Sequence, residues 1–287
     1  MKCLILGGTG QLGHALAAAA PAGMEITAPP RAQCDITNPG QLRQVLDEIR
    51  PALAINAAGY TDVNGAESNE RHAHAVNAEG AGALAALCRK QDARLIHLST
   101  DFVFDGAARA PYAEDAVPHP LNAYGRSKAE GEKRVRHEHE GAVIIRTAWL
   151  YAAQGRNFVG TMLGQMQARD EVKVVADQTG TPTYARNLAR ALWRLAAKGA
   201  AGIYHVTDEG EASWHDFALA IRDEALALGL LTRNPKIVAI SSKDFPSPAR
   251  RPAYSVLGKS RLHAELDPGQ AWRAALKDML VAKKRGD

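Results

Sequence analysis

Short apolar runs alternate with segments of helical spacing through the first half of the chain. The segments between the runs carry apolar residues three and four positions apart. We predict buried strands at residues 2–6, 24–28, 52–56, 94–99 and 142–147. One helix start is well marked, since Asn38 can cap and Pro39 fits the first turn before residues 41–49. Because parallel strands need right-handed crossovers, the alternation predicts an α/β fold, a Rossmann-like doubly wound parallel sheet with helices on both faces.

The second half keeps part of this rhythm and adds longer connections. We predict strands at 172–176 and 202–206 and helices at 213–228 and 268–282. The connections at 150–170, 178–182 and 241–252 are rich in Pro, Gly and Arg and are typical of binding loops. We therefore expect a core at 1–150, to which the two strands return, and a smaller C-terminal lobe from the rest of 151–287.

Composition narrows the class of protein. The chain has 287 residues, of which 46% are hydrophobic and 23% charged, as in ordinary globular proteins. Its 35 Lys and Arg against 31 Asp and Glu give a net charge of +4, too small for a nucleic-acid partner. Cys3, Cys34 and Cys88 lack the paired spacing of disulfides or zinc ligands. The first apolar run is too short for a signal peptide and no run has membrane length, so we expect a cytoplasmic protein.

A glycine-rich turn follows the first predicted strand and opens a helix. Gly7, Gly10 and Gly13 allow a tight turn, close approach of the backbone to a pyrophosphate, and close packing of helix on strand. The helix N-terminus supplies N–H donors and partial positive charge. The Gly-x-x-Gly-x-x-Gly spacing favours a short-chain dehydrogenase type of cofactor site, although the same glycines would also suit a turn without a ligand.

The end of the second predicted strand decides between NAD and NADP. An acidic residue there would bind the ribose 2′-hydroxyl of NAD, but the chain continues with Pro29-Pro30-Arg31. The Arg31 guanidinium matches a 2′-phosphate, which favours NADPH. A solvated loop arginine is the alternative, so NADH stays open.

Tyr124 and Lys128 lie four residues apart and share a face if this segment is helical. A ketone reductase must deliver a proton to the carbonyl oxygen, and a nearby cation lowers the pKa of a phenol. This spacing alone is weak evidence in a chain with seven tyrosines. Its position after the fourth strand, which ends near Thr100, strengthens it because ligands bind at the carboxyl ends of parallel strands. Thr100 could polarise the same carbonyl or only cap the turn.

Motifs along nearly the whole chain carry a family resemblance. They occupy residues 7–13, 56–61, 99–106, 120–128, 146–151, 177–183 and 251–252. Together they resemble the dTDP-4-dehydrorhamnose reductases, a family of extended short-chain dehydrogenases/reductases. The motifs at Arg146–Tyr151 and Asp177–Thr183 are more specific than the patterns shared by the whole superfamily, so the resemblance extends beyond the fold.

The resemblance implies NAD(P)H-dependent reduction of the 4-keto group of dTDP-4-dehydro-6-deoxy-L-mannose to dTDP-L-rhamnose. It makes Tyr124 the proton donor, Lys128 its electrostatic partner and ribose ligand, and Thr100 the residue that tunes the carbonyl. The implied cofactor residues are Gly7, Gly10, Gln11, Leu12 and Gly13 at the pyrophosphate, Arg31, Asp35 and Ile36 at the adenosine end, and Ala57, Ala58, Gly59, Tyr60 and Thr61 near the middle. The implied substrate residues are Thr100, Asp101 and Trp149 at the sugar and Arg250 and Arg251 at the diphosphate.

Some positions depart from the family pattern. The family is associated with a magnesium-linked dimer through a glutamate just after the glycine turn, where this chain has His14-Ala15. We therefore predict no metal site and leave a homodimer open. The run His137–Glu140 lacks metal-ligand spacing and reads as a solvated helix end. The paired Tyr/Phe position of the family's active-site loop is Phe102 here, which should cost a hydroxyl but no catalytic group.

Three other interpretations compete with this one. A dehydratase would need an acid pair after the threonine, but Asp101 is followed by Phe102. An epimerase uses the same Tyr and Lys pair with a retained NAD. A non-catalytic regulatory subunit of this fold is the third, and the intact Thr100, Tyr124 and Lys128 weigh against it. Without the resemblance, Trp149 would be a core aromatic at the end of a strand.

Overall fold

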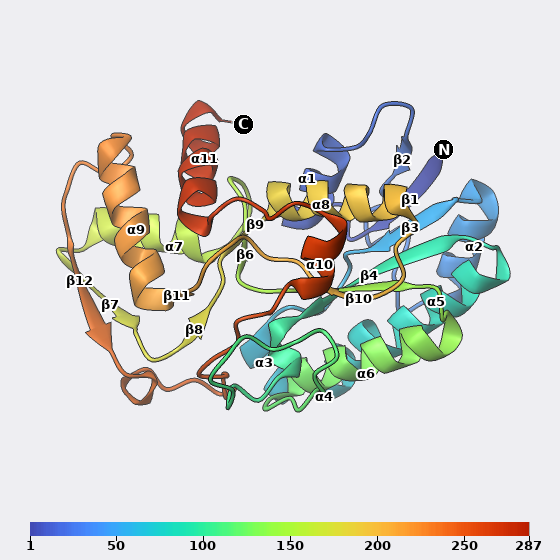
Figure 1. The fold of residues 1–287 in the computed structure, drawn as a ribbon, viewed down its shortest axis with the longest axis horizontal. Helices are drawn as coiled ribbons and strands as arrows, with labels where there is room; N and C mark the ends of the chain where they lie inside the picture. Colours follow the sequence, from blue (N-terminus) through green and yellow to red (C-terminus); the bar gives the residue numbers. More distant parts are fainter. Residues whose placement is uncertain (287) are drawn as a thin grey trace.

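A six-stranded parallel sheet forms the larger part of the computed structural model, which describes residues 1–286 (Figure 1). The sheet runs outward in both directions from the first strand, so the strand order reverses beside it, where doubly wound sheets bind ligands. In spatial order the strands are β10 (Gly202–His205), β5 (Val143–Thr147), β4 (Arg94–Thr100), β3 (Leu53–Asn56), β1 (Lys2–Leu6) and β2 (Glu25–Thr27). The predicted fold class and these strands are confirmed.

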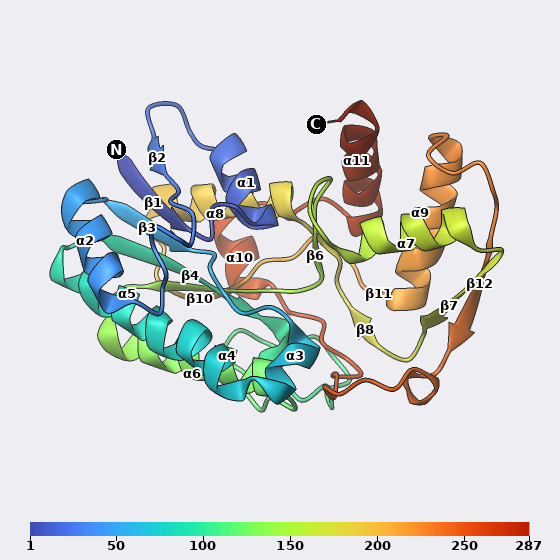
Figure 2. The same ribbon diagram turned by 180° about the vertical axis from the view of Figure 1, so that it is seen from behind.

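Helices cover both faces of this sheet (Figure 2). Cys3 and Ile5 of β1 pack toward α1 (Gln11–Ala18) and α8 (Ala185–Lys198), while Leu4 and Leu6 pack toward the opposite face. That opposite face carries α2 (Pro39–Ile49), α5 (Gly80–Lys90) and α6 (Ala123–Glu138). Burial on both faces explains why the strands read as continuous apolar runs.

Helix α2 begins where the sequence predicts a side-chain cap. The Asn38 side chain accepts from the backbone N–H groups of Gly40 and Gln41, with Pro39 in the first turn of α2, as predicted. Short helical segments connect β3 to α5 and β4 to α6. They are α3 (Val63–Ser68), α4 (Glu70–His74), a π-helix (Ala75–Glu79) and a 3₁₀ turn (Asp101–Val103).

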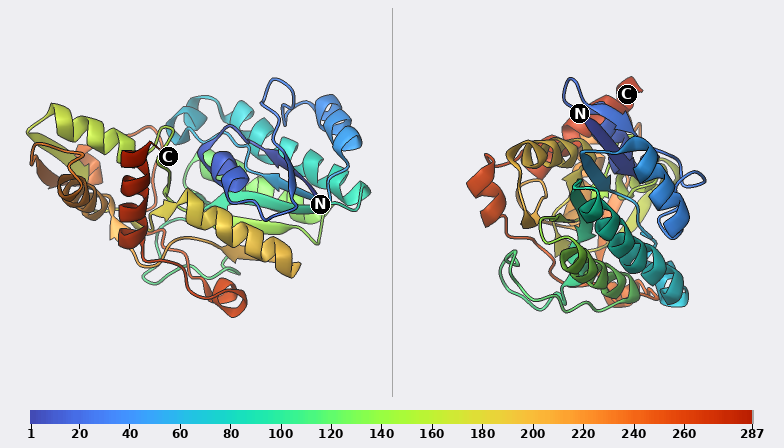
Figure 3. Two further views of the ribbon diagram at one scale, coloured as in Figure 1. Left: turned by 90° about the horizontal axis from the view of Figure 1, so that it is seen from above. Right: turned by 90° about the vertical axis from the view of Figure 1, so that its right-hand side faces the viewer.

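A smaller lobe lies beside the sheet and has its own apolar core (Figure 3). Its helices are α7 (Phe158–Ala168), α9 (Trp214–Ala227) and α11 (Trp272–Arg285). Its strand pairs are β6 (Leu150–Tyr151) with β9 (Thr183–Tyr184), β7 (Glu171–Val175) with β12 (Lys236–Ile240), and β8 (Thr179–Gly180) with β11 (Ala212–Ser213). A 3₁₀ turn (Ser242–Asp244) follows β12.

Two expectations for the second half were wrong. The strand predicted at 172–176 is β7, which pairs with β12 in the smaller lobe and does not return to the large sheet. Its residues alternate between buried and exposed, as in a strand with one covered face, whereas the strands of the large sheet are buried on both. The segment 150–170 is not one loop, because Asn157 caps helix α7 within it.

Segments late in the chain complete the large sheet. Strand β10, predicted at 202–206, pairs with β5, as expected. Helix α8 packs on the same sheet through Leu188 and Leu192, and α10 (Ser260–Glu265) adds Leu262. The sequence pattern did not predict that these two helices belong to the core. The final residue of the predicted lobe, 287, lies outside the described residues.

Candidate active site

The predicted cofactor and catalytic residues meet at the carboxyl edge of the large sheet. The glycine turn follows β1, residues 57–61 follow β3, and Thr100 ends β4. These strands are neighbours in the order β4-β3-β1, so their carboxyl ends lie side by side. This edge is where doubly wound sheets bind nucleotides.

The glycine turn has the geometry that a pyrophosphate requires. Gly7 has φ of 76°, and a Cβ at this position would stand 2.6 Å from the carbonyl carbon of Ala57. A Cβ on Gly13 would stand 2.4 Å from the oxygen of Gly7. Helix α1 begins at Gln11, and no side chain caps its N-terminal N–H groups. The backbone donors of Gln11 and Leu12 therefore remain for an anion.

Asn77 fixes the loop at residues 57–61. Its Oδ1 accepts from the backbone N–H of Tyr60 at 2.9 Å, and its Nδ2 donates to the Tyr60 carbonyl at 3.0 Å. The same Nδ2 lies 2.9 Å from Oγ of Ser127 on helix α6. Asn77 belongs to the π-helix, and such segments often occur at functional sites. No local pattern in the sequence links Asn77 to Tyr60, so its role was not predicted.

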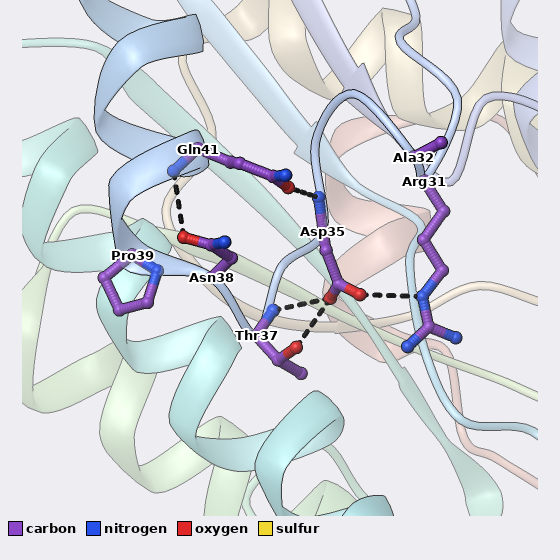
Figure 4. Close-up of a pocket in the computed structure, with 7 residues that line it drawn as sticks. All are labelled: Arg31, Ala32, Asp35, Thr37, Asn38, Pro39 and Gln41. Atoms are coloured by element: carbon purple, nitrogen blue, oxygen red, sulfur yellow. Dashed lines mark hydrogen bonds and ion pairs between the residues drawn. The ribbon is translucent and has the colours of Figure 1, made fainter.

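Arg31 and Asp35 line a pocket of about 680 Å³ beyond β2 (Figure 4). The Nε of Arg31 donates to Asp35 at 2.9 Å. Burial raises the pKa of Asp35, but hydrogen bonds from Thr37 and Arg31 outweigh it and lower the pKa to about 2. Ile36 is buried against Gly80 and does not line this pocket. The pocket therefore presents a guanidinium and a carboxylate together.

Thr100 and Asp101 are joined by hydrogen bonds to each other and to a distant loop. The Thr100 hydroxyl donates to Asp101 at 3.0 Å, and Oγ of Ser255 donates to the other Asp101 oxygen at 2.6 Å. Burial raises the pKa of Asp101 to about 6, although both hydroxyls lower it. Ser255, which the sequence analysis missed, ties the end of β4 to a segment more than half the chain away.

Tyr124 lies in the first turn of α6, beside Thr100 and Phe102. Asn122 caps this helix by accepting from the Gly125 N–H at 2.7 Å. The Tyr124 ring meets the Phe102 ring edge-on at 5.9 Å. Burial raises the pKa of Tyr124 to about 12, while a hydrogen bond with the Thr100 side chain acts in the opposite direction. The phenol is therefore protonated at neutral pH, which is the form that donates a proton.

Lys128 lies one turn further along α6 and is buried. Its ammonium donates to the Leu98 carbonyl of β4. Burial lowers the pKa of Lys128 to about 8, and the Glu132 carboxylate acts against this shift. The electrostatic role of Lys128 toward Tyr124 stays a prediction.

Glu132 itself is held by a buried ion pair. Its Oε2 lies 2.7 Å from Nη2 of Arg146 on β5, and its Oε1 accepts from Ser99 at 2.5 Å. These contacts fix the position of the Glu132 side chain one helical turn from Lys128.

The remaining predicted substrate residues, Trp149, Arg250 and Arg251, lie outside the strands of the large sheet. Trp149 stacks on Trp214, the first residue of α9, with ring centroids 3.4 Å apart. Arg251 donates to Ser247 and, at 3.2 Å, to Oδ1 of Asn64. The Arg250 side chain is exposed, and its carbonyl accepts from Asn122 at 2.8 Å. Sequence reasoning missed Trp214, whose only local signal is the Ser213 cap before it.

Residues 1–286 contain neither a cluster of metal ligands nor a membrane-spanning helix. Within residues 1–286, no group of three or more His, Cys, Asp or Glu side chains could hold a metal ion. None of the helices in this range is long and apolar enough to cross a membrane.

Known proteins resemble this chain along its full length. A family model described as the RmlD substrate binding domain matches residues 1–285. The dTDP-4-dehydrorhamnose reductase of Aggregatibacter actinomycetemcomitans is 39% identical over 288 residues, which cover 97% of this chain and 98% of that protein. The dTDP-4-keto-6-deoxy-D-glucose reductase of Streptomyces niveus is 41% identical over 279 residues, which cover 96% and 95%.

A solved structure has the same fold as this chain, at a sequence identity close to that of these two relatives. The dTDP-4-dehydrorhamnose reductase of Bacillus anthracis, in complex with NADP, superposes with a TM-score of 0.93 at 36% identity and covers 98% of each chain. Fold, site and relatives together define the class as NAD(P)H-dependent reductases of dTDP-sugars. Within this class, the chain belongs to the dTDP-4-dehydrorhamnose reductase (RmlD) family.

Proposed function

We propose that this chain reduces the 4-keto group of dTDP-4-dehydro-6-deoxy-L-mannose to give dTDP-L-rhamnose, with NADPH as cofactor. The observation that carries the proposal is the partly buried Tyr124 phenol, which lies in the first turn of α6 at the carboxyl edge of the sheet, edge-on to Phe102. The direction of its pKa shift, upward through desolvation, keeps the proton on the phenol at neutral pH. Reduction of a ketone consumes a proton at oxygen, so a protonated phenol at this edge suits reduction. The names of the relatives from A. actinomycetemcomitans and B. anthracis support this substrate.

Each catalytic side chain has a distinct role in this proposal. When bound, the nicotinamide supplies the hydride that reaches the carbonyl carbon. Tyr124 gives its proton to the carbonyl oxygen and becomes a phenolate, and the Thr100 hydroxyl, turned away from Asp101, polarises that carbonyl. Lys128 binds the ribose hydroxyls through its ammonium group and keeps positive charge near the phenolate.

The cofactor residues have a geometry that suits a dinucleotide. The close approaches at Gly7 and Gly13 and the free N–H groups of α1 fit a pyrophosphate. Arg31 supports NADPH over NADH, because its guanidinium lies in the pocket at the adenosine end and matches a 2′-phosphate. Asp35 would then orient that guanidinium.

The substrate residues act on the two ends of the nucleotide sugar. Asp101 and Trp149 bind the sugar, and Arg250 and Arg251 bind the diphosphate. A cytoplasmic location, which the sequence predicts, gives the enzyme access to both nucleotide ligands.

One assay tests the activity. The purified chain is supplied with NADPH and either dTDP-4-dehydro-6-deoxy-L-mannose or dTDP-4-keto-6-deoxy-D-glucose, the sugar named for the S. niveus relative. We expect stoichiometric NADPH oxidation and dTDP-L-rhamnose from the first sugar, with lower kcat/KM for the second. Preference for the second would replace the proposed substrate. Turnover without net NADPH oxidation would indicate an epimerase, and no turnover would favour a regulatory subunit.

A further inference from the structure

The backbone of Trp149 is strained at the catalytic edge of the sheet. Its φ of 46° lies in the left-handed region, which is unfavourable for a bulky side chain. The other non-glycine residues in this region, within residues 1–286, are Arg50 and Asp92, which follow helices α2 and α5. Trp149 instead lies between strands β5 and β6. Strain at such a place persists only where the surroundings hold it.

Two neighbours hold the Trp149 ring. The Trp214 ring lies parallel to it, with 5° between the planes and 3.4 Å between the centroids. Aromatic rings left to themselves favour offset or edge-on contacts over this face-to-face arrangement. Gly180 lies against the ring, because a Cβ there would be 2.7 Å from Cε2 and Nε1 of Trp149. One face and one edge of the indole are thus taken by the protein.

Trp214 is held firmly in turn. Ser213 caps α9 in a capping box, in which Ser213 and Asp216 each bond the backbone N–H of the other. The β8–β11 pairing places Ala212 opposite Gly180. The Phe158 ring of α7 packs on Trp214 with centroids 4.6 Å apart. Trp214 is therefore a rigid support rather than a mobile surface residue.

The same strands connect Trp149 to Asp101. On the other side of β8, the Thr179 N–H donates to the Ala253 carbonyl, and the Ser255 N–H donates to the Thr179 carbonyl, both at 2.8 Å. Ser255 then donates through its hydroxyl to Asp101 at 2.6 Å. The paired segments at residues 179–180 and 253–255 thus contact both Trp149 and Asp101, the two side chains that the proposed function assigns to the sugar.

We propose that Trp214 is a positioning residue of the sugar subsite. It covers one face of the Trp149 indole and leaves the opposite face to the hexose ring of the nucleotide sugar. The C–H groups and methyl group of a 6-deoxyhexose offer apolar surface to such an aromatic face. The inference rests on the proposed function, because it takes Trp149 as a sugar contact.

The test compares variants on both sides of the stack. For Trp214→Ala we expect the KM of the sugar nucleotide to rise roughly tenfold, with kcat and the NADPH Kd little changed, because uniform sugar binding is lost. Trp214→Phe keeps a flat ring and should restore most of the affinity. Gly180→Ala pushes the indole from its edge without changing α9, so it should raise the same KM. The exciton signal of the stacked indoles in circular dichroism should disappear in Trp214→Phe and in Trp149→Phe.

The outcomes separate this inference from the proposed function. If Trp149→Ala leaves the sugar KM unchanged, the sugar site of the proposed function is wrong. If Trp149→Ala raises the KM while Trp214→Ala and Gly180→Ala do not, the inference about Trp214 alone is overturned. Should Trp214→Ala fail to fold, Trp214→Phe and Gly180→Ala decide the question. A wild-type KM in Gly180→Ala, with the exciton signal lost, would also overturn it.

Discussion

The side chain of Asn157 donates to Oε1 of Gln11 at 2.9 Å, across a separation of 146 residues. Gln11 is the first residue of α1 at the glycine turn, and its Nε2 donates back to the Arg156 carbonyl at 3.1 Å. Asn157 also caps α7 by accepting from the Gly160 N–H at 3.0 Å. One residue of the smaller lobe thus braces the turn that would bind the cofactor.

Asn157→Asp should separate the brace from the cap. The aspartate keeps the oxygen that caps α7 but loses the N–H group that donates to Gln11. We expect the NADPH Kd to rise about three- to tenfold, because the turn loses its preorganisation. The melting temperature should also fall, because the new carboxylate oxygen faces the Ala152 and Gly155 carbonyls to which Nδ2 donates. Fluorescence titration and thermal unfolding measure the two effects. Asn157→Ala, the control, should also lose about 1 kcal/mol of stability with the cap. Wild-type cofactor affinity in Asn157→Asp would show that the brace is unimportant.

Tyr124→Phe should remove turnover and leave cofactor binding intact. The phenol supplies the proton in our proposal, and general-acid groups typically contribute about 10²–10⁴ in rate. The edge-on contact with Phe102 does not need the hydroxyl, so the fold should survive. Steady-state kcat and NADPH titration are the measurements. Tyr204→Phe on the edge strand β10 is the matched control and should keep wild-type kcat. Near wild-type turnover in Tyr124→Phe would assign the proton to another group.

Deprotonation of Lys128 should lower kcat/KM for NADPH at alkaline pH. Burial lowers the pKa of Lys128 to about 8, so the ammonium loses its proton as pH rises through this value. We therefore expect kcat/KM for NADPH to fall above about pH 8. Glu132→Gln removes the carboxylate that raises this pKa and should move this fall to lower pH. Lys133→Ala, an exposed neighbour, should leave the profile unchanged. If kcat/KM of the Lys128→Ala variant falls at the same pH as that of the wild type, another group is responsible for the fall.

Arg31→Ala should weaken NADPH and spare NADH. Only NADPH carries the 2′-phosphate that the guanidinium is proposed to bind, so we expect roughly a tenfold rise in the KM for NADPH alone. Asp35→Asn removes the carboxylate that holds Arg31 in an exposed ion pair and should change the NADPH preference less. Arg43→Ala, exposed on α2, serves as control. Equal effects on both cofactors would contradict the assignment.

The sequence predicted the large sheet because its strands are buried on both faces and read as unbroken apolar runs. It misplaced β7, since Val172 and Val174 alternate with exposed residues and local pattern does not specify the partner β12. The motifs after β1 and β3 and at the end of β4 predicted that these segments share one edge of the sheet. Asn77, Ser255 and Trp214 were not predictable, because each acts through a contact with a distant segment.

The arrangement of the large sheet has a consequence for the order of synthesis. Strand β5 lacks its outer neighbour until β10, at Gly202–His205, leaves the ribosome, and the face beneath α1 lacks α8 until Lys198 has emerged. Helix α10, which covers more of this face, comes still later. The N-terminal half therefore leaves the ribosome with an open β edge and uncovered apolar surface, and the large sheet with its helices is complete only after β10 and α10 have emerged.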